Sequence, residues 1–277
     1  SMGIGDGDSS GDLITVAHET LRKEPPREMK GEGVHLVGFP PARGRIELAE
    51  LLRKAGIPVQ QFHLPDVHVN RLKDYREAVV QLLWPAEEYN RLYGELFEPL
   101  PVPAVRIAPP FGVAGTDAFV RQAAEAAGVD SEVALAALAE ERTRCEEELA
   151  RLRPFCAPHR IGVALTARQV ELAQHPEKTQ GIPFVSLLEE LGFQVEVLKN
   201  SEEEKRLNWW LRSGLSGVVT DVAHDRRLLD LGVSPVGFSD LEAGYAGAIR
   251  SAQRVLNVCS TPFFRDFARY AGTEVSR

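Results

Sequence analysis

The sequence predicts an α/β protein in which two parallel-sheet domains are joined by a long helix. Short apolar runs, bounded by Gly or Pro, alternate with segments of helical spacing along most of the chain. Such runs are typical of parallel strands, because helices cover both faces of a parallel sheet. The alternation pauses at one long helical segment and then resumes, and 277 residues are comfortable for two domains.

An unusual N-terminal segment precedes the first of these domains. Residues 1–31 begin with SMGIGDGDSSGD, which has no apolar periodicity, and continue with one helix-like stretch, LITVAHETLRKE. The sequence PPREMKGEG then breaks the pattern. We therefore expect residues 1–31 to be a loop and a helix left from a preceding domain.

The first domain is expected at residues 32–153, with a sheet formed by four short apolar runs. These expected strands are 33–39, 57–64, 78–84 and 102–107. The helices expected between them carry apolar residues on one side and are 45–55, 69–77, 85–97 and 117–127. Pro85 suits the first position of its helix, where a missing N–H loses no hydrogen bond.

The connecting helix is expected at Ser131–Arg153, with Ser131 as its N-cap and Pro154 ending it. The second domain, residues 154–277, repeats the alternation. Its expected strands are 160–165, 193–198, 217–222 and 233–238. Its expected helices are 183–191, 201–213, 223–231 and 241–258.

Charge and composition exclude several classes of protein. The net charge is −8 with no long basic stretch, so nucleic acid is not an expected partner. No apolar run approaches the roughly 20 residues of a membrane span, and we see no signal peptide. The cysteines, Cys145, Cys156 and Cys259, are too few and too widely spaced for a disulfide framework or a CxxC metal site. They favour a reducing compartment, so we expect a cytoplasmic protein with no metal site on this chain.

The segment PPFGVAGTDAF, residues 109–119, is the leading candidate for a ligand site. It joins an expected strand to an expected helix, and helix N-termini at strand ends attract anions in parallel sheets. Gly112 and Gly115 would let the backbone approach a ligand, and Thr116 could donate to a ligand oxygen. Thr116 and Asp117 could equally cap the helix, so ligand contact and capping remain alternatives here.

Two further strand ends carry polar residues. The loop GFPPARGR places Gly38 and Arg43 after the first strand, where an arginine can grip a carboxylate or extend into solvent. His63 ends the second strand, with Asp66 and His68 close behind, which suits a pocket wall better than a metal site. We expect these strand ends to line a ligand cleft, with His63 as the candidate proton donor.

The motifs of self-contained catalysts are absent. The sequence has no GxSxG, HExxH or Walker A motif. TDVAHD places Asp221, His224 and Asp225 together, but no nucleophile stands beside them. A self-contained hydrolase is therefore not supported.

The order of these segments resembles that of the nitrogenase component 1 family along nearly the whole chain. GVHLVGFPPARGRIELAELLRKAGIPVQ is similar to the start of that family's middle domain, and the candidate ligand segment is similar to a later part of it. The residues that occupy the family pattern there are Gly112, Thr116, Asp117, Phe119 and Arg121. GVVTDVAHDRRLLDLGVSPVGF and the helix that carries the GY-x-G pattern at Gly244, Tyr245 and Gly247 are similar to the third domain.

The resemblance implies Rossmann-like domains around a cleft and a role as part of an oxidoreductase subunit, either tetrapyrrole-reductase-like or a cofactor scaffold. Subunits of this family pair with a homologous subunit and receive electrons from an ATP-dependent iron–sulfur reductase. This sequence lacks the cysteine-bearing first domain, and Leu83 and Trp84 stand near the position of nitrogenase's metallocofactor cysteine. We therefore expect no cofactor on this chain alone, an iron–sulfur cluster in the missing domain or a partner subunit, and no activity in isolation.

Two other functions remain open at this level. Two lobes joined by a helix also suit a non-catalytic small-molecule-binding protein that closes around its ligand. A nucleotide-sugar transferase would have two such domains as well, but we find no phosphate-binding Gly loop near Arg168–Gln180.

Overall fold

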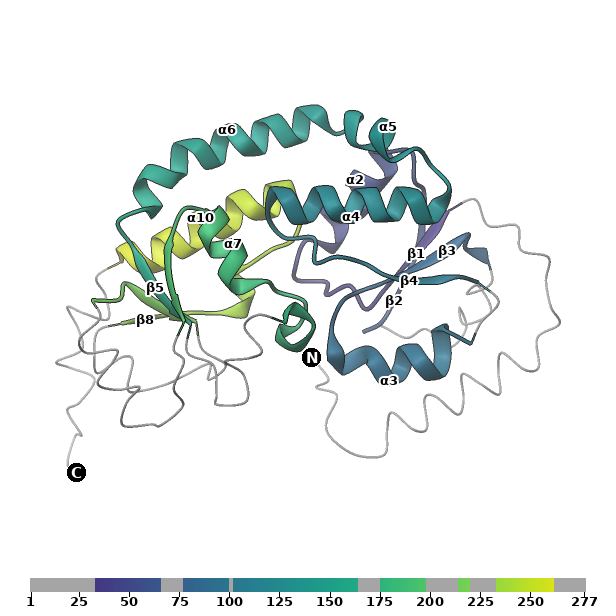
Figure 1. Ribbon diagram of the computed structural model, residues 1–277, viewed down its shortest axis with the longest axis horizontal. Coiled ribbons are helices and arrows are strands. Elements are labelled where there is room, and N and C mark those ends of the chain that lie inside the picture. Colours follow the sequence, from purple (N-terminus) through teal and green to yellow (C-terminus); the bar gives the residue numbers. More distant parts are fainter. Residues whose placement is uncertain are drawn as a thin grey trace, which may run out of the picture.

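The computed structural model describes residues 33–65, 77–99, 102–163, 175–197, 214–219 and 233–261. Within these ranges it has two lobes, each with a four-stranded parallel sheet, and a long helix, α6 (Ala139–Cys156), that runs above them (Figure 1). We call residues 33–127 the first lobe and residues 160–261 the second lobe. The predicted class, an α/β protein with two parallel sheets, is confirmed.

The two sheets have the same strand order. In the first lobe the order is β2-β1-β3-β4, and in the second it is β6-β5-β7-β8, with all neighbouring strands parallel. The strands of the first lobe are β1 (Val34–Val37), β2 (Val59–His63), β3 (Val80–Leu83) and β4 (Ala104–Arg106). Those of the second lobe are β5 (Arg160–Val163), β6 (Gln194–Val197), β7 (Gly217–Val219) and β8 (Ser234–Val236). Each strand lies within an apolar run that the sequence predicts as a strand.

Helices lie on both faces of the first sheet. α2 (Arg45–Lys54) and α4 (Gly112–Ala127) lie on one face, and α3 lies on the other (Figure 1). The helix expected at 85–97 consists of three short pieces: a 3₁₀ turn η2 (Glu87–Tyr89), α3 (Asn90–Leu92) and a π-helical turn η3 (Tyr93–Phe97). The expected helix at 69–77 falls outside the described residues, except for its last position.

The prediction of a single connecting helix at Ser131–Arg153 is wrong, because the chain forms two helices there. These are α5 (Ser131–Ala136) and α6 (Ala139–Cys156). The N-cap of α5 is Asp130, whose carboxylate accepts the N–H groups of Glu132 and Val133 at 2.9 and 3.1 Å. Pro154 lies inside α6 and does not end it, since a proline so near the C-terminus removes only one hydrogen bond of the last turn.

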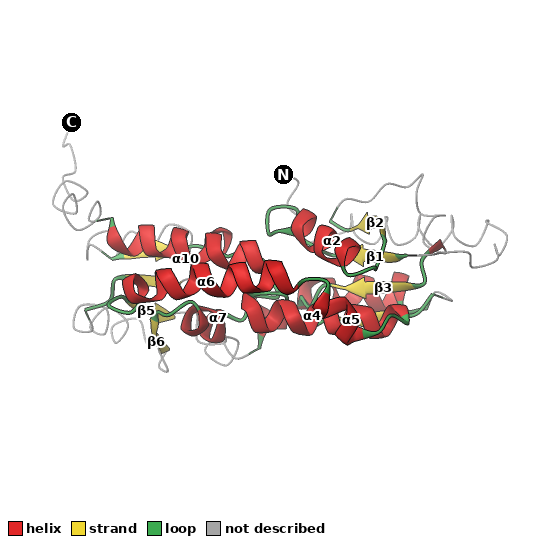
Figure 2. Cartoon of the chain, turned by 90° about the horizontal axis from the view of Figure 1, so that it is seen from above, coloured by secondary structure: helices red, strands yellow, loops and turns green. Residues whose placement is uncertain are grey.

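The second lobe contains two longer helices and two 3₁₀ turns within the described residues. They are η5 (Pro176–Thr179), α7 (Phe184–Glu190), η6 (Phe238–Asp240) and α10 (Tyr245–Ser260). The helices expected at 201–213 and 223–231 fall outside the described residues. α10 lies beside α6, as the view from above shows (Figure 2), and it also contacts α4 of the first lobe.

One hydrophobic core extends through both lobes. It contains Leu48 and Phe119 of the first lobe, Val163 and Tyr245 of the second, and Cys145 of α6. Because the core is continuous, the lobes are packed against each other rather than linked as separate bodies. No helix in the described part of the chain has the length and apolar character that crossing a membrane requires.

Candidate functional site: the seam between the lobes

The residues predicted to bind a ligand cluster mainly where the two lobes meet. We call this contact region the seam: it comprises 38–47, Trp84 and 109–117 from the first lobe, and 180–190 and 241–250 from the second. The first-lobe segments follow the carboxyl ends of β1, β3 and β4, or begin the next helix, as the sequence predicts. The strand ends of a parallel sheet are the usual place for a ligand site.

Arg43 reaches across the seam. Its guanidinium donates to the side-chain oxygen of Gln180 at 2.5 Å and to the Gln180 carbonyl at 3.3 Å. The indole N–H of Trp84 donates to the same carbonyl at 3.1 Å. Burial lowers the pKa of Arg43, partly offset by Glu88 and Tyr89. The predicted ligand-gripping arginine therefore holds the other lobe in this structure.

Gly38 adopts a left-handed conformation, with φ at 79°, directly against Tyr93. A Cβ at this position would overlap the Tyr93 hydroxyl, which donates to the carbonyls of Trp84 and Val37 at 3.0 and 3.3 Å. Tyr93 is buried, and burial raises the pKa of its phenol. The close approach that Gly38 permits is therefore to a core tyrosine.

The start of α4 differs from the prediction. The helix begins at Gly112 and not at Asp117, so the expected ligand loop is the first turn of the helix. Thr116 is fully buried, and its hydroxyl donates back to the Gly112 carbonyl at 2.6 Å. Gly115 lies where a Cβ would come within 2.5 Å of the Pro109 carbonyl oxygen. Ligand contact by these residues stays a prediction, but each has a structural role here.

A carboxylate from the second lobe occupies the N-terminus of α4. The Glu190 carboxylate accepts the backbone N–H of Val113 at 2.6 Å, and Gly112, with φ at 72°, leaves room for it. α4 has no side-chain cap from its own N-cap residue, Phe111. The helix end that the sequence marks as an anion site therefore binds an anion of the protein itself.

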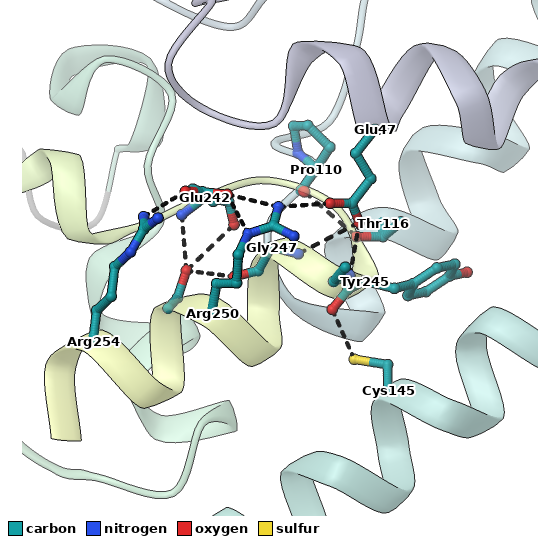
Figure 3. Close-up of polar contacts among 11 residues, drawn as sticks. Glu47, Pro110, Thr116, Cys145, Glu242, Tyr245, Gly247, Arg250 and Arg254 are labelled. Atoms are coloured by element: carbon teal, nitrogen blue, oxygen red, sulfur yellow. Dashed lines mark hydrogen bonds and ion pairs between the residues drawn. The ribbon is translucent and has the colours of Figure 1, made fainter. Parts of the chain in front are cut away.

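The N-terminus of α10 is arranged in the same way, with the lobes exchanged. The Glu47 carboxylate from α2 accepts the N–H groups of Ala246 and Gly247 at 2.7 and 3.4 Å (Figure 3). A Cβ on Gly244, whose φ is 90°, would come within 2.5 Å of the same carboxylate. Arg250 pairs with Glu47 at 2.8 Å.

Arg250 lies between two carboxylates (Figure 3). It binds Glu242 at 2.6 Å as well as Glu47, and Arg254 pairs with the other side of Glu242. Burial lowers the pKa of Arg250, but the hydrogen bonds from the two carboxylates outweigh it and raise the pKa overall. The Glu242 and Glu47 side chains are only 11% and 17% exposed, so this network is mostly shielded from solvent.

Asp117 joins three helices, whereas the sequence suggests that it serves α4 alone. Its carboxylate accepts the hydroxyl of Tyr245 at 2.5 Å and pairs with Arg142 at 3.1 Å. The Tyr245 carbonyl in turn accepts the thiol of Cys145 at 3.1 Å (Figure 3). Burial raises the pKa of Tyr245, with a further rise from Asp117, and burial raises the pKa of the Cys145 thiol to about 12.

His63 is packed in the first lobe rather than placed among the seam residues. It is 5% exposed, and its Nε2 lies 3.1 Å from Nδ1 of His35 on the neighbouring strand. Its ring also packs against Phe97. The role of His63 as proton donor stays a prediction. Asp66, His68 and the segment TDVAHD beyond Val219 lie outside the described residues.

Two hollows that are lined by described residues adjoin the seam. The larger, about 580 Å³, lies between α2, α6 and the start of α10, and Glu47, Arg144 and Arg250 line it. The smaller, about 250 Å³, lies between the lobes and is lined by Phe111, Gly115 and residues of α7 including Glu190. Within the described ranges, no three His, Cys, Asp or Glu residues are arranged to hold a metal ion.

Sequence reasoning missed the two acids that cross the seam. In the sequence, Glu47 and Glu190 have the pattern of ordinary exposed positions on amphipathic helices, and Gln180 has that of a loop residue. The available signal is a glycine at a helix start with no Ser, Thr, Asp or Asn to cap it, as at Gly244. Such a start needs an acceptor from elsewhere in the molecule.

Comparison with protein families identifies a family, and comparison with solved structures identifies a fold. The family model described as nitrogenase component 1 type oxidoreductase matches residues 15–231. A structure titled "Nitrogenase Cp1 at pH 5" superposes with a TM-score of 0.65 at 12% identity, covering 98% of this chain and 65% of that one. A second, "Nitrogenase Cp1 at pH 6.5", superposes with a TM-score of 0.54 at 16% identity, covering 95% of this chain and 67% of that one.

A different kind of protein also shares the fold. A structure titled "Crystal structure of ZnuA" superposes with a TM-score of 0.52 at 13% identity, covering 82% of this chain and 99% of that one. No curated protein matches the sequence. At these identities the structural matches establish the fold alone. The chain spans 65% of the length of the first nitrogenase structure.

Proposed function

The chain belongs to the nitrogenase component 1 type oxidoreductase family, and from this premise we propose that it is part of an oxidoreductase subunit that passes electrons to a bound substrate or cofactor. The observation that carries the proposal is the family match over residues 15–231, which covers the whole first lobe and the second lobe as far as residue 231. The proposed subunit works with a homologous subunit and an ATP-dependent iron–sulfur reductase. A tetrapyrrole-reductase-like enzyme or a cofactor scaffold is the proposed member type.

The packed seam supports this proposal. A redox subunit needs its substrate and its electron donor at fixed separation, so the wall of its cleft has to be rigid. Here a continuous core, Arg43, Trp84 and the two crossing carboxylates fix one lobe against the other. In the proposed arrangement the first lobe contributes one wall of the cleft.

An iron–sulfur cluster does not fit the cysteines of this chain. Cluster ligands are thiolates that converge on one centre, and within the described residues no three His, Cys, Asp or Glu side chains are arranged in this way. Burial also raises the pKa of Cys145 and Cys259 to about 12 and that of Cys156 to about 11. The Cys145 thiol is also engaged by the Tyr245 carbonyl. We therefore assign the cluster to another domain or to a partner subunit and derive no step through it.

The proposal is tested on the complete gene product, purified without oxygen together with its partner subunit. We expect iron and acid-labile sulfide in the complex, and a dithionite-reduced electron paramagnetic resonance signal that decays when protochlorophyllide is added as a probe. The 277-residue chain alone should hold no stoichiometric iron. A complex with no reducible centre would contradict the proposal, and so would a cluster bound by the chain alone.

A second candidate function is that of a two-lobed small-molecule-binding protein. The observation that favours it is the ZnuA superposition, which covers 99% of that chain. Another matching structure is titled as a ZnuA deletion mutant with zinc bound, so zinc is the probe to use. Calorimetric titration with zinc chloride separates the two functions: one tight site per chain would favour this candidate, and no binding would leave the oxidoreductase proposal in place.

A further inference from the structure

We propose that Glu47 and Glu190 form a reciprocal clasp that holds the two lobes in a single orientation. Glu47 belongs to the first lobe and binds the start of α10 in the second. Glu190 belongs to the second lobe and binds the start of α4 in the first. This inference concerns the lobes themselves and holds whichever reaction the protein supports.

Both helices depend on the opposite lobe for a cap. The N-cap residues of α4 and α10 are Phe111 and Gly244, and neither supplies a side-chain acceptor. The first N–H groups of a helix have no partner within it, and the helix dipole adds a preference for negative charge. α5 shows the ordinary solution, since Asp130 caps it locally. A carboxylate from the other lobe fills the same need at α4 and at α10.

Each helix start also leaves space for the carboxylate from the other lobe. Gly112 has φ at 72° and Gly244 has φ at 90°, a region that side-chain-bearing residues rarely adopt. A Cβ on Gly112 would overlap the Glu190 carboxylate, and a Cβ on Gly244 would meet that of Glu47. The same three parts, a glycine, an uncapped helix start and an acid from the other lobe, therefore occur twice.

The two halves of the clasp are adjacent, so they act together. The Gly244 N–H donates to the Pro110 carbonyl at 2.8 Å, which joins the start of α10 to the segment before α4. The hydroxyl of Tyr245 donates to Asp117 on α4. Separating the lobes would remove the carboxylate from both helix starts at once and leave their first N–H groups with water in place of a negatively charged acceptor. The 250 Å³ hollow between the lobes is therefore a fixed feature and does not open by lobe motion.

Hydrogen exchange of the complete gene product tests the cap itself. In Glu190→Ala we expect the first-turn amides of α4 to exchange about five- to tenfold faster, although the change lies in the other lobe. In Glu47→Ala we expect the same at the first turn of α10. The matched controls are Glu189→Ala and Glu50→Ala, whose exposed side chains lie on the same two helices. They should change exchange less than twofold at those amides.

A distance measurement tests the orientation of the lobes. Spin labels on Glu125→Cys of α4 and Gln253→Cys of α10, with Cys259→Ser, report the interlobe distance by pulsed electron resonance. The Glu47→Ala/Glu190→Ala double variant should broaden this distance distribution, and the double control should not. An unchanged distribution would overturn the clasp even if exchange rises locally.

Glutamine variants keep the proposal testable if the alanine variants fail to fold. Glu47→Gln and Glu190→Gln keep an acceptor but lose the charge, so they should raise amide exchange at the helix starts about two- to threefold. No rise in exchange would also overturn the clasp.

Discussion

The starts of α4 and α10 receive a carboxylate in the same way but differ in what surrounds it. At α10, Glu47 is also paired with Arg250, which binds Glu242 in turn. At α4, Glu190 forms no ion pair within the described residues, and its carboxylate binds the Val113 N–H. The α10 start is therefore held by a network of charges and the α4 start by the carboxylate and the helix dipole. The difference implies that removing the charge of Arg250 will weaken the start of α10 and leave the start of α4 unchanged.

The largest expected effect comes from removing Trp84, which packs against Phe111 at the start of α4 and crosses the seam to Gln180. Trp84 is 1% exposed, packs edge-on against Phe39 and Phe111, and binds Gln180 across the seam. Trp84→Ala should lower the free energy of unfolding by about 3–5 kcal/mol, because it leaves a cavity in the core and removes one of the two hydrogen bonds to the Gln180 carbonyl. Urea unfolding measures this. Phe155→Ala is the control, since Phe155 is 65% exposed and its loss should change stability by less than about 0.5 kcal/mol.

A smaller effect separates the two helix starts. Arg250→Ala removes the cation shared by Glu47 and Glu242, which are mostly buried, while Arg250 itself is 40% exposed. We expect a loss of about 1–2 kcal/mol, reduced for that exposure, and faster exchange at α10 but not at α4. Arg91→Ala, which breaks an exposed pair with Glu95, should cost less than about 0.5 kcal/mol. Equal effects on both helix starts would contradict the comparison.

A local cap provides the reference for the caps from the opposite lobe. Asp130→Ala removes the acceptor of two N–H groups at α5 and should cost about 1 kcal/mol. Hydrogen exchange should speed up in α5 alone, because the donor and acceptor belong to the same segment. If exchange also rose at the starts of α4 and α10, local and interlobe caps would not be distinct.

The smallest expected effect is a pH dependence of stability that is present only at alkaline pH. It comes from Cys145, whose thiol donates to the carbonyl of Tyr245 at the start of α10. Burial raises its pKa to about 12, above the roughly 8.5 of a free thiol. Above about pH 8.5 the unfolded chain loses this proton first, so stability falls as pH rises toward 12. Cys145→Ala should reduce the decline between pH 8.5 and 11 and show no pH-dependent difference near pH 7. Urea unfolding across this range measures it, and an unchanged slope in the variant would count against the buried, protonated thiol.

The strands and the helix boundaries show which parts of the secondary structure the sequence patterns predict and which they do not. Every described strand lies in a predicted apolar run, because such a run is a local signal, most clearly for the fully buried strands β1 and β3. Periodicity also located α2 and α10, apart from their ends. It placed the start of α4 too late, since Gly112 and Gly115 resemble loop residues when the packing that requires glycine is unknown. It also merged α5 with α6, whose separation follows no change in periodicity.

The sequence by itself determined the fold class, the strands and the family resemblance, because these depend on local periodicity and on the order of segments along the chain. Tertiary structure alone decided what the predicted site residues touch. Glu190 lies 77 positions from Val113, and Glu47 lies 199 positions from Ala246. No local pattern encodes a hydrogen bond over such a distance, since it exists only when the packed core brings the two lobes together. For that reason, the space beside the glycines, which the sequence suggests is for a ligand, is filled in this structure by the protein's own carboxylates and carbonyls.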